Sequence, residues 1–302
     1  MADQITTKPK YKVIKSGIDF NNSDKVLQPK IDGSNSLFEL NSDSDNKIYS
    51  YRISKRTGSN IDHTNQVPDL KNVAVPNKFD GTVLRGELYA VKNDKPVPAE
   101  IIGGMLNAGV AKSLQLQKEK GVLKPYIYDI VRLSGENVEN DSYRSKYEML
   151  KRIEAAVPEM RVAETAFTPE QKKLLIDKIK SGRHKDTKEG LVEWDLNKPT
   201  GAPAKFKFRD NFEVVIRNIN QEVDKYGKGK QQAGSFDYSW TPKGKIVGSV
   251  GTGMDRNRKR DIYKNPQDYI GRIARVQSPQ KYQTGALRAP SFYSLHIEKN
   301  LQ

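Results

Sequence analysis

Short runs of alternating apolar and polar residues dominate the first two thirds of the chain, and this period of two is typical of half-buried strands. Residues 36–40 and 47–53 form such runs around a polar segment and predict a hairpin. Residues 83–91 and 126–131 are more continuously apolar and predict strands buried on both faces. A further strand is expected near residues 11–14.

Three segments have a helical pattern. Residues 99–117 predict one helix, loosened by two adjacent glycines near its start. A second helix is expected to be capped by Asp141 or Ser142, with apolar positions at helical spacing after the cap. A third begins with the capping box Thr168-Pro169-Glu170-Gln171 and ends at Gly182. We assign the second and third helices to the scaffold.

After Asp210 the pattern changes to short strands separated by glycine turns, at residues 212–219, 245–250, 269–276 and 292–297. Two basic loops are expected to interrupt them, one around residues 228–230 and one around residues 256–260. This alternation is typical of a small Greek-key barrel with loops that face phosphates. The sequence therefore predicts an α+β protein of two domains, residues 1–209 and 210–302, the first with antiparallel sheets and flanking helices.

Charge narrows the choice of partner. The net charge of +15 and the pI near 9.6 indicate a polyanionic partner. Basic residues are spread along the chain and adjoin no apolar anchor, so nucleic acid is favoured and no membrane association is expected. With no cysteine, disulfides, thiol catalysis and zinc fingers are excluded. A ribosomal or packaging protein would have the same charge balance, so charge alone does not choose an activity.

Lys30 is the first candidate for chemistry. It lies in Pro-Lys-Ile-Asp-Gly-Ser-Asn, residues 29–35, where a strand edge meets an Asp-Gly turn. A lysine attacks only when neutral, so a site must lower its pKa from about 10.4 by burial or by nearby cations. Lys205 and Lys207 alternate on one face of a predicted strand and are suitable cations. The alternatives are a solvated lysine beside a turn and an edge strand with solvated lysines.

Two carboxylates stand out because of their apolar surroundings. Glu87 interrupts an apolar strand, and Glu189 precedes Gly190 at the start of another. Either carboxylate could hold a metal or form a structural ion pair. Tyr128 could form the wall of a base pocket or belong to the core, and Arg56 lies in a basic turn that could hold a phosphate.

In chain order these segments resemble the ATP-dependent DNA ligases, over nearly the whole sequence. The motifs that carry the resemblance are Lys30-x-Asp32-Gly33, Leu84-Arg85-Gly86-Glu87-Leu88, Tyr128-Asp129-Ile130, Glu189-Gly190 and Lys205-x-Lys207, followed by the basic barrel. The chain looks like a minimal member, as found in viruses and some bacteria. The resemblance implies a nucleotidyltransferase (adenylation) domain followed by an OB-fold, without the N-terminal DNA-clamping domain of larger relatives.

The resemblance implies a lysine–AMP mechanism. Lys30, in the motif that includes Asp32, would attack the α-phosphate of ATP and hold AMP as a phosphoramidate. Lys205 and Lys207 would contact that phosphate, and their charges would help Lys30 to become neutral. AMP would then pass to the 5′-phosphate of a nick, and the 3′-hydroxyl would displace it. All three steps are phosphoryl transfers that depend on metal and cations.

Cofactor roles follow from the same resemblance. Glu87 would bind the ribose or a metal-bound water, and Glu189 would help to place Mg²⁺. Tyr128 would stack on adenine, Arg56 would contact the ribose or the nick 5′-phosphate, and Lys299 would supply a C-terminal cation to the nucleotide. Nicked duplex DNA would be held by Arg56, Lys228, Lys230, Arg256, Arg258, Arg260 and Arg288. A monomer is expected, in the cytoplasm of a bacterium or a virus-infected cell, with roles in DNA replication, repair or recombination.

Two positions depart from the family pattern. Asn35 stands where DNA ligases usually have arginine, and asparagine there is more typical of one RNA ligase family. The C-terminal Arg-x-Asp-Lys pattern reads His296-Ile297-Glu298-Lys299, and Arg288 could share the role of the missing arginine. A ligase of RNA-containing nicks is therefore the second hypothesis. A non-catalytic nucleic-acid-binding protein is the third.

Overall fold

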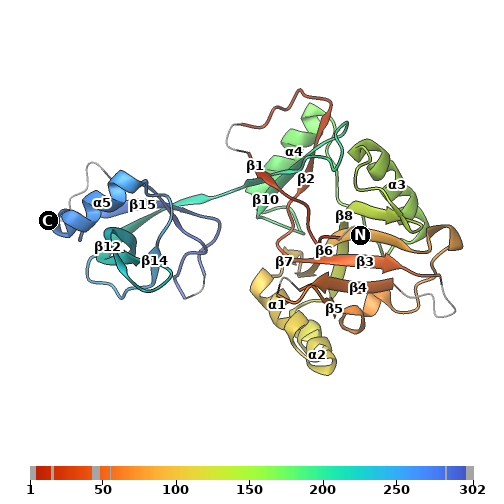
Figure 1. Ribbon diagram of the computed structural model, residues 1–302, viewed down its shortest axis with the longest axis horizontal. Helices are drawn as coiled ribbons and strands as arrows, with labels where there is room; N and C mark the ends of the chain where they lie inside the picture. Colours follow the sequence, from red (N-terminus) through yellow and green to blue (C-terminus); the bar gives the residue numbers. More distant parts are fainter. Residues whose placement is uncertain (1–4, 15–16, 43–47, 55, 283, 297–302) are drawn as a thin grey trace. The chain divides into compact units, whose positions relative to one another are not determined.

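The computed structural model describes residues 5–14, 17–42, 48–54, 56–282 and 284–296. The chain divides into two compact units, residues 1–207 and 208–302 (Figure 1). The boundary lies just before the position expected from the change in sequence pattern. Each unit is described by itself.

A seven-stranded antiparallel sheet forms the centre of the first unit, in the order β5-β4-β3-β6-β8-β9 with β7 paired to β6. Its strands are β3 (Ser34–Leu40), β4 (Ile48–Ile53), β5 (Asn60–Asp62), β6 (Thr82–Lys92), β7 (Lys95–Pro96), β8 (Leu123–Leu133) and β9 (Glu136–Asn137). The hairpin of β3 and β4 and the two buried strands β6 and β8 confirm the predictions from apolar spacing.

A second sheet in this unit has the order β1-β11-β10-β2. Its strands are β1 (Lys12–Val13), β2 (Lys25–Pro29), β10 (Gly190–Asp195) and β11 (Ala204–Lys207). Because β1 pairs with β11 in parallel at Ala204 and Lys205, β11 is an interior strand there, and the expectation of an edge strand is wrong.

The helices pack outside the sheets, with α3 against β8 and α4 against β2 and β10 (Figure 1). They are α1 (Ala99–Asn107), α2 (Val110–Lys120), α3 (Tyr143–Ala156) and α4 (Pro169–Lys180). The prediction of one helix over residues 99–117 is wrong. The break falls at Ala108, whose backbone is extended, and Gly109 caps α2, while the two glycines inside α1 leave it intact. Ser142 caps α3, and the capping box of α4 is present.

Both sheets contribute to one hydrophobic core. Phe38, Leu84 and Ile127 of the large sheet belong to the same buried cluster as Val26 and Trp194 of the small one. This shared core holds β2 and β10 beside β6 and β8. Lys30 follows the end of β2, Glu189 precedes β10, and Glu87 lies within β6.

The second unit is a curled five-stranded sheet in the order β14-β13-β12-β15-β16, with its own core. It contains β12 (Asp210–Val223), β13 (Gly229–Ser239), β14 (Gly248–Val250), α5 (Arg256–Lys264), β15 (Ile273–Ser278) and β16 (Ser291–Leu295). The two edge strands are β14 and β16. A bridge between Thr252, just after β14, and Ser291 of β16 connects them, and the sheet forms a half-barrel.

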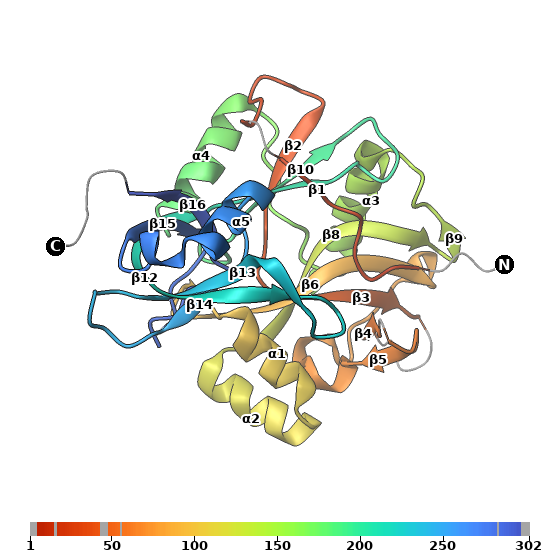
Figure 2. The same ribbon diagram turned by 60° about the vertical axis from the view of Figure 1, so that its left-hand side comes forward.

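Two expectations for this unit are wrong. The segment around residues 256–260 is helix α5, packed on β13, and not a loop (Figure 2). Residue 228 lies in a turn, but Gly229 begins β13, a long strand that the sequence pattern did not predict. None of the helices in the described ranges is long and apolar enough to cross a membrane.

Candidate active site

Lys30 follows directly after β2, and its side chain meets the two later motifs. Its Nζ donates a hydrogen bond to Glu189 Oε2 at 2.7 Å. The other oxygen of that carboxylate forms an ion pair with Lys207, on β11. Lys205, two residues earlier on the same strand, feels the charges of Lys207 and Lys30. The structure thus brings Lys30, Glu189, Lys205 and Lys207 together, although 159 residues separate the first two in sequence.

Two glycines allow the backbone to approach closely at this point. A Cβ on Gly33 would lie 2.4 Å from the carbonyl oxygen of Leu88, and a Cβ on Gly190 would lie 2.1 Å from that of Phe206. Gly190 also has φ of +150°, which L-residues rarely adopt. These contacts give a physical reason for glycine after Asp32 and after Glu189.

Glu87 is buried on β6, opposite Asn35 on β3. The Asn35 amide donates to one of its carboxylate oxygens, and also lies 3.4 Å from the Tyr128 hydroxyl. The other oxygen of Glu87 is buried and has no hydrogen-bond partner in the described part of the chain. Burial, opposed by the charge of Lys30, raises the pKa of the Glu87 carboxyl to about 8. A ligand hydroxyl or a cation would satisfy this oxygen.

The expectation that neighbouring cations lower the pKa of Lys30 is wrong for the protein alone. Burial lowers the pKa of the Lys30 amine, but the carboxylates around it, Glu189 first among them, raise it above its usual value. Lys205 is the lysine whose pKa is lowered, by burial and then by the charges of Lys207 and Lys30. Lys30 is therefore held protonated until its carboxylate partners are engaged elsewhere.

Two hollows adjoin these residues. A small cavity of about 20 Å³ is lined by Lys30, Glu87 and Tyr128. An open cleft of about 1210 Å³ is lined by Asn35, Arg56 and Lys205, among others. The small cavity has room for little more than a water molecule, whereas the cleft is large enough for a nucleotide. Tyr128 is only 6% exposed, so adenine would have to open this cavity before it could stack on the ring.

Tyr11 borders both hollows, and the sequence analysis did not assign it to the site. It precedes β1, hydrogen-bonds Tyr128, and has the ammonium of Lys205 at 6.0 Å from its ring centre. Thr187, close to Glu189, was missed as well. Neither residue belongs to a motif, and only the pairing of distant strands brings them to the site.

The carboxylates of this site suit a magnesium ion only if substrate phosphates bind it as well. Within the described ranges no group of three or more histidine, cysteine, aspartate or glutamate side chains could hold a metal. Glu87 is a single carboxylate on β6, and Glu189 is a single carboxylate directly before β10. Mg²⁺ is commonly bound by one or two carboxylates together with substrate phosphates, and these residues suit that arrangement.

The predicted DNA-binding residues of the second unit do not form one group. Lys230, Arg256 and Arg260 line a groove together with Lys264. Arg258 instead hydrogen-bonds Tyr269, on another side of α5.

The remaining predicted residues lie apart from this groove. Lys228 is in the exposed β12–β13 turn, and the backbone of Arg288 pairs with Gln280. His296 lies 3.2 Å from Glu213. Lys299 lies outside the described residues.

No protein-family model and no curated protein matches the chain. Solved structures do. A Lig E DNA ligase, from work on DNA binding with a minimal scaffold, has a TM-score of 0.61 at 14% identity and covers 96% of this chain and 100% of its own. Pmar-Lig_PreS3 and Pmar-Lig_Pre each have a TM-score of 0.63 at 16% identity, and the matches cover 63% and 64% of those chains. The fold is that of minimal DNA ligases, which confirms the predicted adenylation domain plus OB-fold.

Proposed function

We propose that this chain is an ATP-dependent ligase that seals nicks in duplex DNA through a lysine–AMP intermediate. The observation that carries the proposal is the ion-paired group of Lys30, Glu189 and Lys207 beside a nucleotide-sized cleft. The ligase fold supports it, because this group lies in the unit that resembles an adenylation domain.

In the first step, the Lys30 nitrogen attacks the α-phosphorus of ATP. A phosphorus–nitrogen bond forms, the bond from the α-phosphorus to the bridging oxygen breaks, pyrophosphate leaves, and Lys30 loses a proton. Glu189 and the phosphates would hold Mg²⁺, which would supply positive charge to the leaving group. A cation on Glu189 would weaken the charge that raises the pKa of Lys30, and the amine would become neutral more readily.

The other site residues act on charge and orientation. Lys205 and Lys207 stabilise the negative charge on the phosphate oxygens, and Arg56 does the same farther along the cleft. The unpaired oxygen of Glu87 forms a hydrogen bond with a ribose hydroxyl, and its burial and the contact of the other oxygen with Asn35 hold it in place for this.

The later steps act on the nick. A 5′-phosphate oxygen attacks the AMP phosphorus and releases Lys30, and the 3′-hydroxyl then attacks the 5′-phosphorus and expels AMP. The groove of Lys230, Arg256, Arg260 and Lys264 holds the backbone of the duplex by charge.

Asn35 supports a second candidate, a ligase of RNA-containing nicks. The Asn35 amide donates a hydrogen bond to Glu87 inside the site. A neutral amide at this position can also hydrogen-bond a 2′-hydroxyl, which distinguishes RNA from DNA. Asn35→Ala would then selectively slow sealing of nicks with a 3′-terminal ribonucleotide.

Sealing assays with four nicked duplexes, DNA or RNA on each side of the break, test both candidates. Wild-type protein with ATP and Mg²⁺ should seal the all-DNA nick fastest, and Lys30→Ala should seal none. Much faster sealing of RNA-ended nicks would replace the first candidate with the second. No sealing of any duplex would contradict both.

A further inference from the structure

Thr187 is fully buried, and its hydroxyl joins two parts of the candidate active site. Its Oγ1 donates to the carbonyl oxygen of Lys30 at 2.6 Å and accepts from the backbone N–H of Glu189 at 3.0 Å. A threonine hydroxyl has one hydrogen to donate, and that hydrogen is directed to the residue that carries the nucleophile.

The main chain of Lys30 is thereby held on both sides by one short segment. Its N–H donates to the carbonyl oxygen of Gly190 at 2.9 Å, and its carbonyl accepts from Thr187. The same segment carries Glu189, whose carboxylate receives the Lys30 ammonium at 2.7 Å. Residues 187–190 therefore fix both the backbone of the nucleophile and the partner of its side chain.

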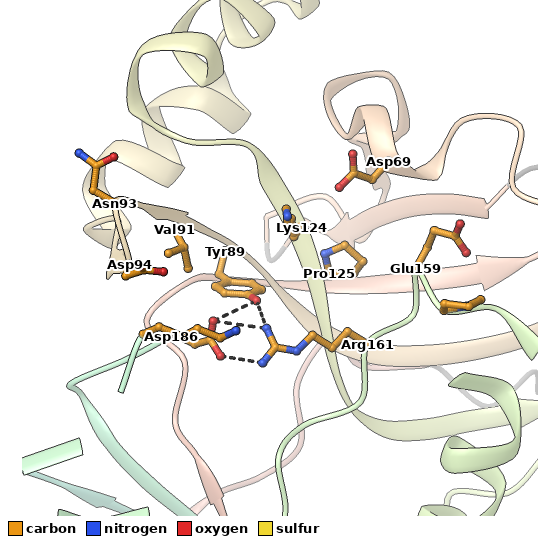
Figure 3. A pocket seen from close by; sticks show the side chains of 12 residues that line it. Asp69, Tyr89, Val91, Asn93, Asp94, Lys124, Pro125, Glu159, Arg161 and Asp186 are labelled. Atoms are coloured by element: carbon orange, nitrogen blue, oxygen red, sulfur yellow. Dashed lines mark hydrogen bonds and ion pairs between the residues drawn. The ribbon is translucent and has the colours of Figure 1, made fainter. Parts of the chain in front are cut away.

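This segment is anchored at its other end by the ion pair of the buried Asp186 with the partly exposed Arg161 (Figure 3). Asp186 is 3% exposed and accepts from Arg161 Nη2 at 2.8 Å. Tyr89 accepts from Arg161 at 2.6 Å and lies 3.3 Å from Asp186. The backbone N–H of Asp186 also donates to His184 Nδ1 at 3.2 Å. With Asp186 fixed, Thr187 has little freedom to follow Lys30 if the lysine backbone moves.

We propose that Thr187 is a positioning residue for the attack of Lys30 on ATP, an inference that rests on the proposed ligase function. Its hydroxyl sets the distance between the end of β2 and the start of β10, and so the direction from which the Lys30 nitrogen approaches the phosphorus. Misplacing a reacting group by about 1 Å can cost roughly a hundredfold in rate.

The test compares Thr187→Val, which keeps the shape and removes the hydroxyl, with Thr187→Ser, which keeps the hydroxyl. Thr82→Val is the matched control, because Thr82 is equally buried at the start of β6 and its hydroxyl accepts only a scaffold N–H, that of Ser134 at 3.0 Å. The readouts are the single-turnover rate of lysine–AMP formation with labelled ATP, the ATP concentration for half-maximal rate, and the melting temperature.

Thr187→Val should lower the rate at saturating ATP by roughly ten- to a hundredfold, with a half-saturating ATP concentration close to that of the wild type. Thr187→Ser should recover most of the rate. Thr82→Val should melt at a lower temperature and react at the wild-type rate. If Thr187→Val does not fold, Thr187→Ala must show the same loss of rate.

A wild-type rate in folded Thr187→Val or Thr187→Ala would overturn the inference while leaving the ligase function in place. So would a serine variant as slow as the valine variant, or an equal loss of rate in Thr82→Val. Absence of the adduct in the wild type would instead remove the proposed function, and this inference with it.

Discussion

Glu189 is shared by two lysines, one oxygen to Lys30 and the other to Lys207. It is only 6% exposed, so its charge is poorly screened by solvent and acts strongly on both. Removing Glu189 would leave the largely buried ammonium of Lys30 without its carboxylate partner, which costs more than the pair itself contributes.

Glu189→Gln keeps the shape of this side chain and removes its charge. Lysine–AMP formation should fall by about a hundredfold or more, because the variant would lose the proposed metal ligand and an orienting partner of Lys30. Glu193→Gln is the control, since Glu193 lies on the same strand β10 and pairs with Lys25 at 2.6 Å, at the far end of β2. Near-wild-type rates for Glu189→Gln at limiting Mg²⁺ would contradict the assignment.

Gly190 gives a prediction about stability. Gly190→Ala should destabilise the first unit by about 2 kcal/mol or more, because the new Cβ would collide with the Phe206 carbonyl at an unfavourable φ. Gly103→Ala, in helix α1 with open space around the Cβ, should instead stabilise it by about 0.5–1 kcal/mol. Urea unfolding measures both, and equal effects of the two substitutions would show that the close contact is not present.

At the scale of elements, helix α5 divides its arginines between two sides. Arg256 and Arg260 line the groove with Lys230, whereas Arg258 is held by Tyr269. Positions four apart lie on one face of a helix, so Arg256, Arg260 and Lys264 form a continuous cationic row.

Arg256→Ala combined with Arg260→Ala should weaken binding of nicked DNA regardless of sequence. The slope of log K against log salt should decrease in magnitude by up to ~1.8, which is ~0.9 for each lost phosphate contact. Arg258→Ala is the control and should leave the slope unchanged. If the slope decreased for Arg258→Ala and stayed unchanged for the double variant, the side of α5 that carries Arg258 would be the one that contacts DNA. Lysine–AMP formation should survive in both variants, since Lys30 and its partners lie in the other unit.

The sequence pattern predicted the strands with strong apolar alternation, such as β6 and β8, and the helix starts that have side-chain caps. It failed for α5 and β13. Ile262 is the one buried residue of α5, so apolar periodicity could not indicate that helix. Strand β13 begins with Gly-Lys-Gln-Gln, whose polar residues give no alternation and are held by pairing with β12. Tertiary contacts determine the secondary structure of such segments.

At the scale of the whole molecule, each of the two units has a large hydrophobic core of its own. Leu84 belongs to the core of the first unit and Ile216 to that of the second, and both are fully or almost fully buried. Leu84→Ala and Ile216→Ala should each cost about 2–5 kcal/mol.

Calorimetry should therefore record two unfolding transitions, with each variant lowering the temperature of one. The two substitutions serve as controls for each other. A single transition lowered by both would mean that the units unfold as one.

The site could be predicted from sequence only as far as its motifs extend. Order and spacing were sufficient to select Lys30, Glu87, Glu189, Lys205 and Lys207. They could not reveal that Glu189 raises the pKa of Lys30, because that depends on a distance of 2.7 Å between distant strands. Thr187 was missed for the same reason, since its role lies in a hydrogen bond to the backbone of Lys30.

In the proposed mechanism, Lys30 carries AMP and passes it to a nick. The most direct measurement is incubation with α-labelled ATP and Mg²⁺, peptide mapping of the labelled protein, and a chase with nicked duplex DNA. The label should map to Lys30, be absent from Lys30→Ala, and move from the protein to the DNA during the chase. Label that persists in Lys30→Ala, or that stays on the protein after addition of nicked DNA, would contradict this account.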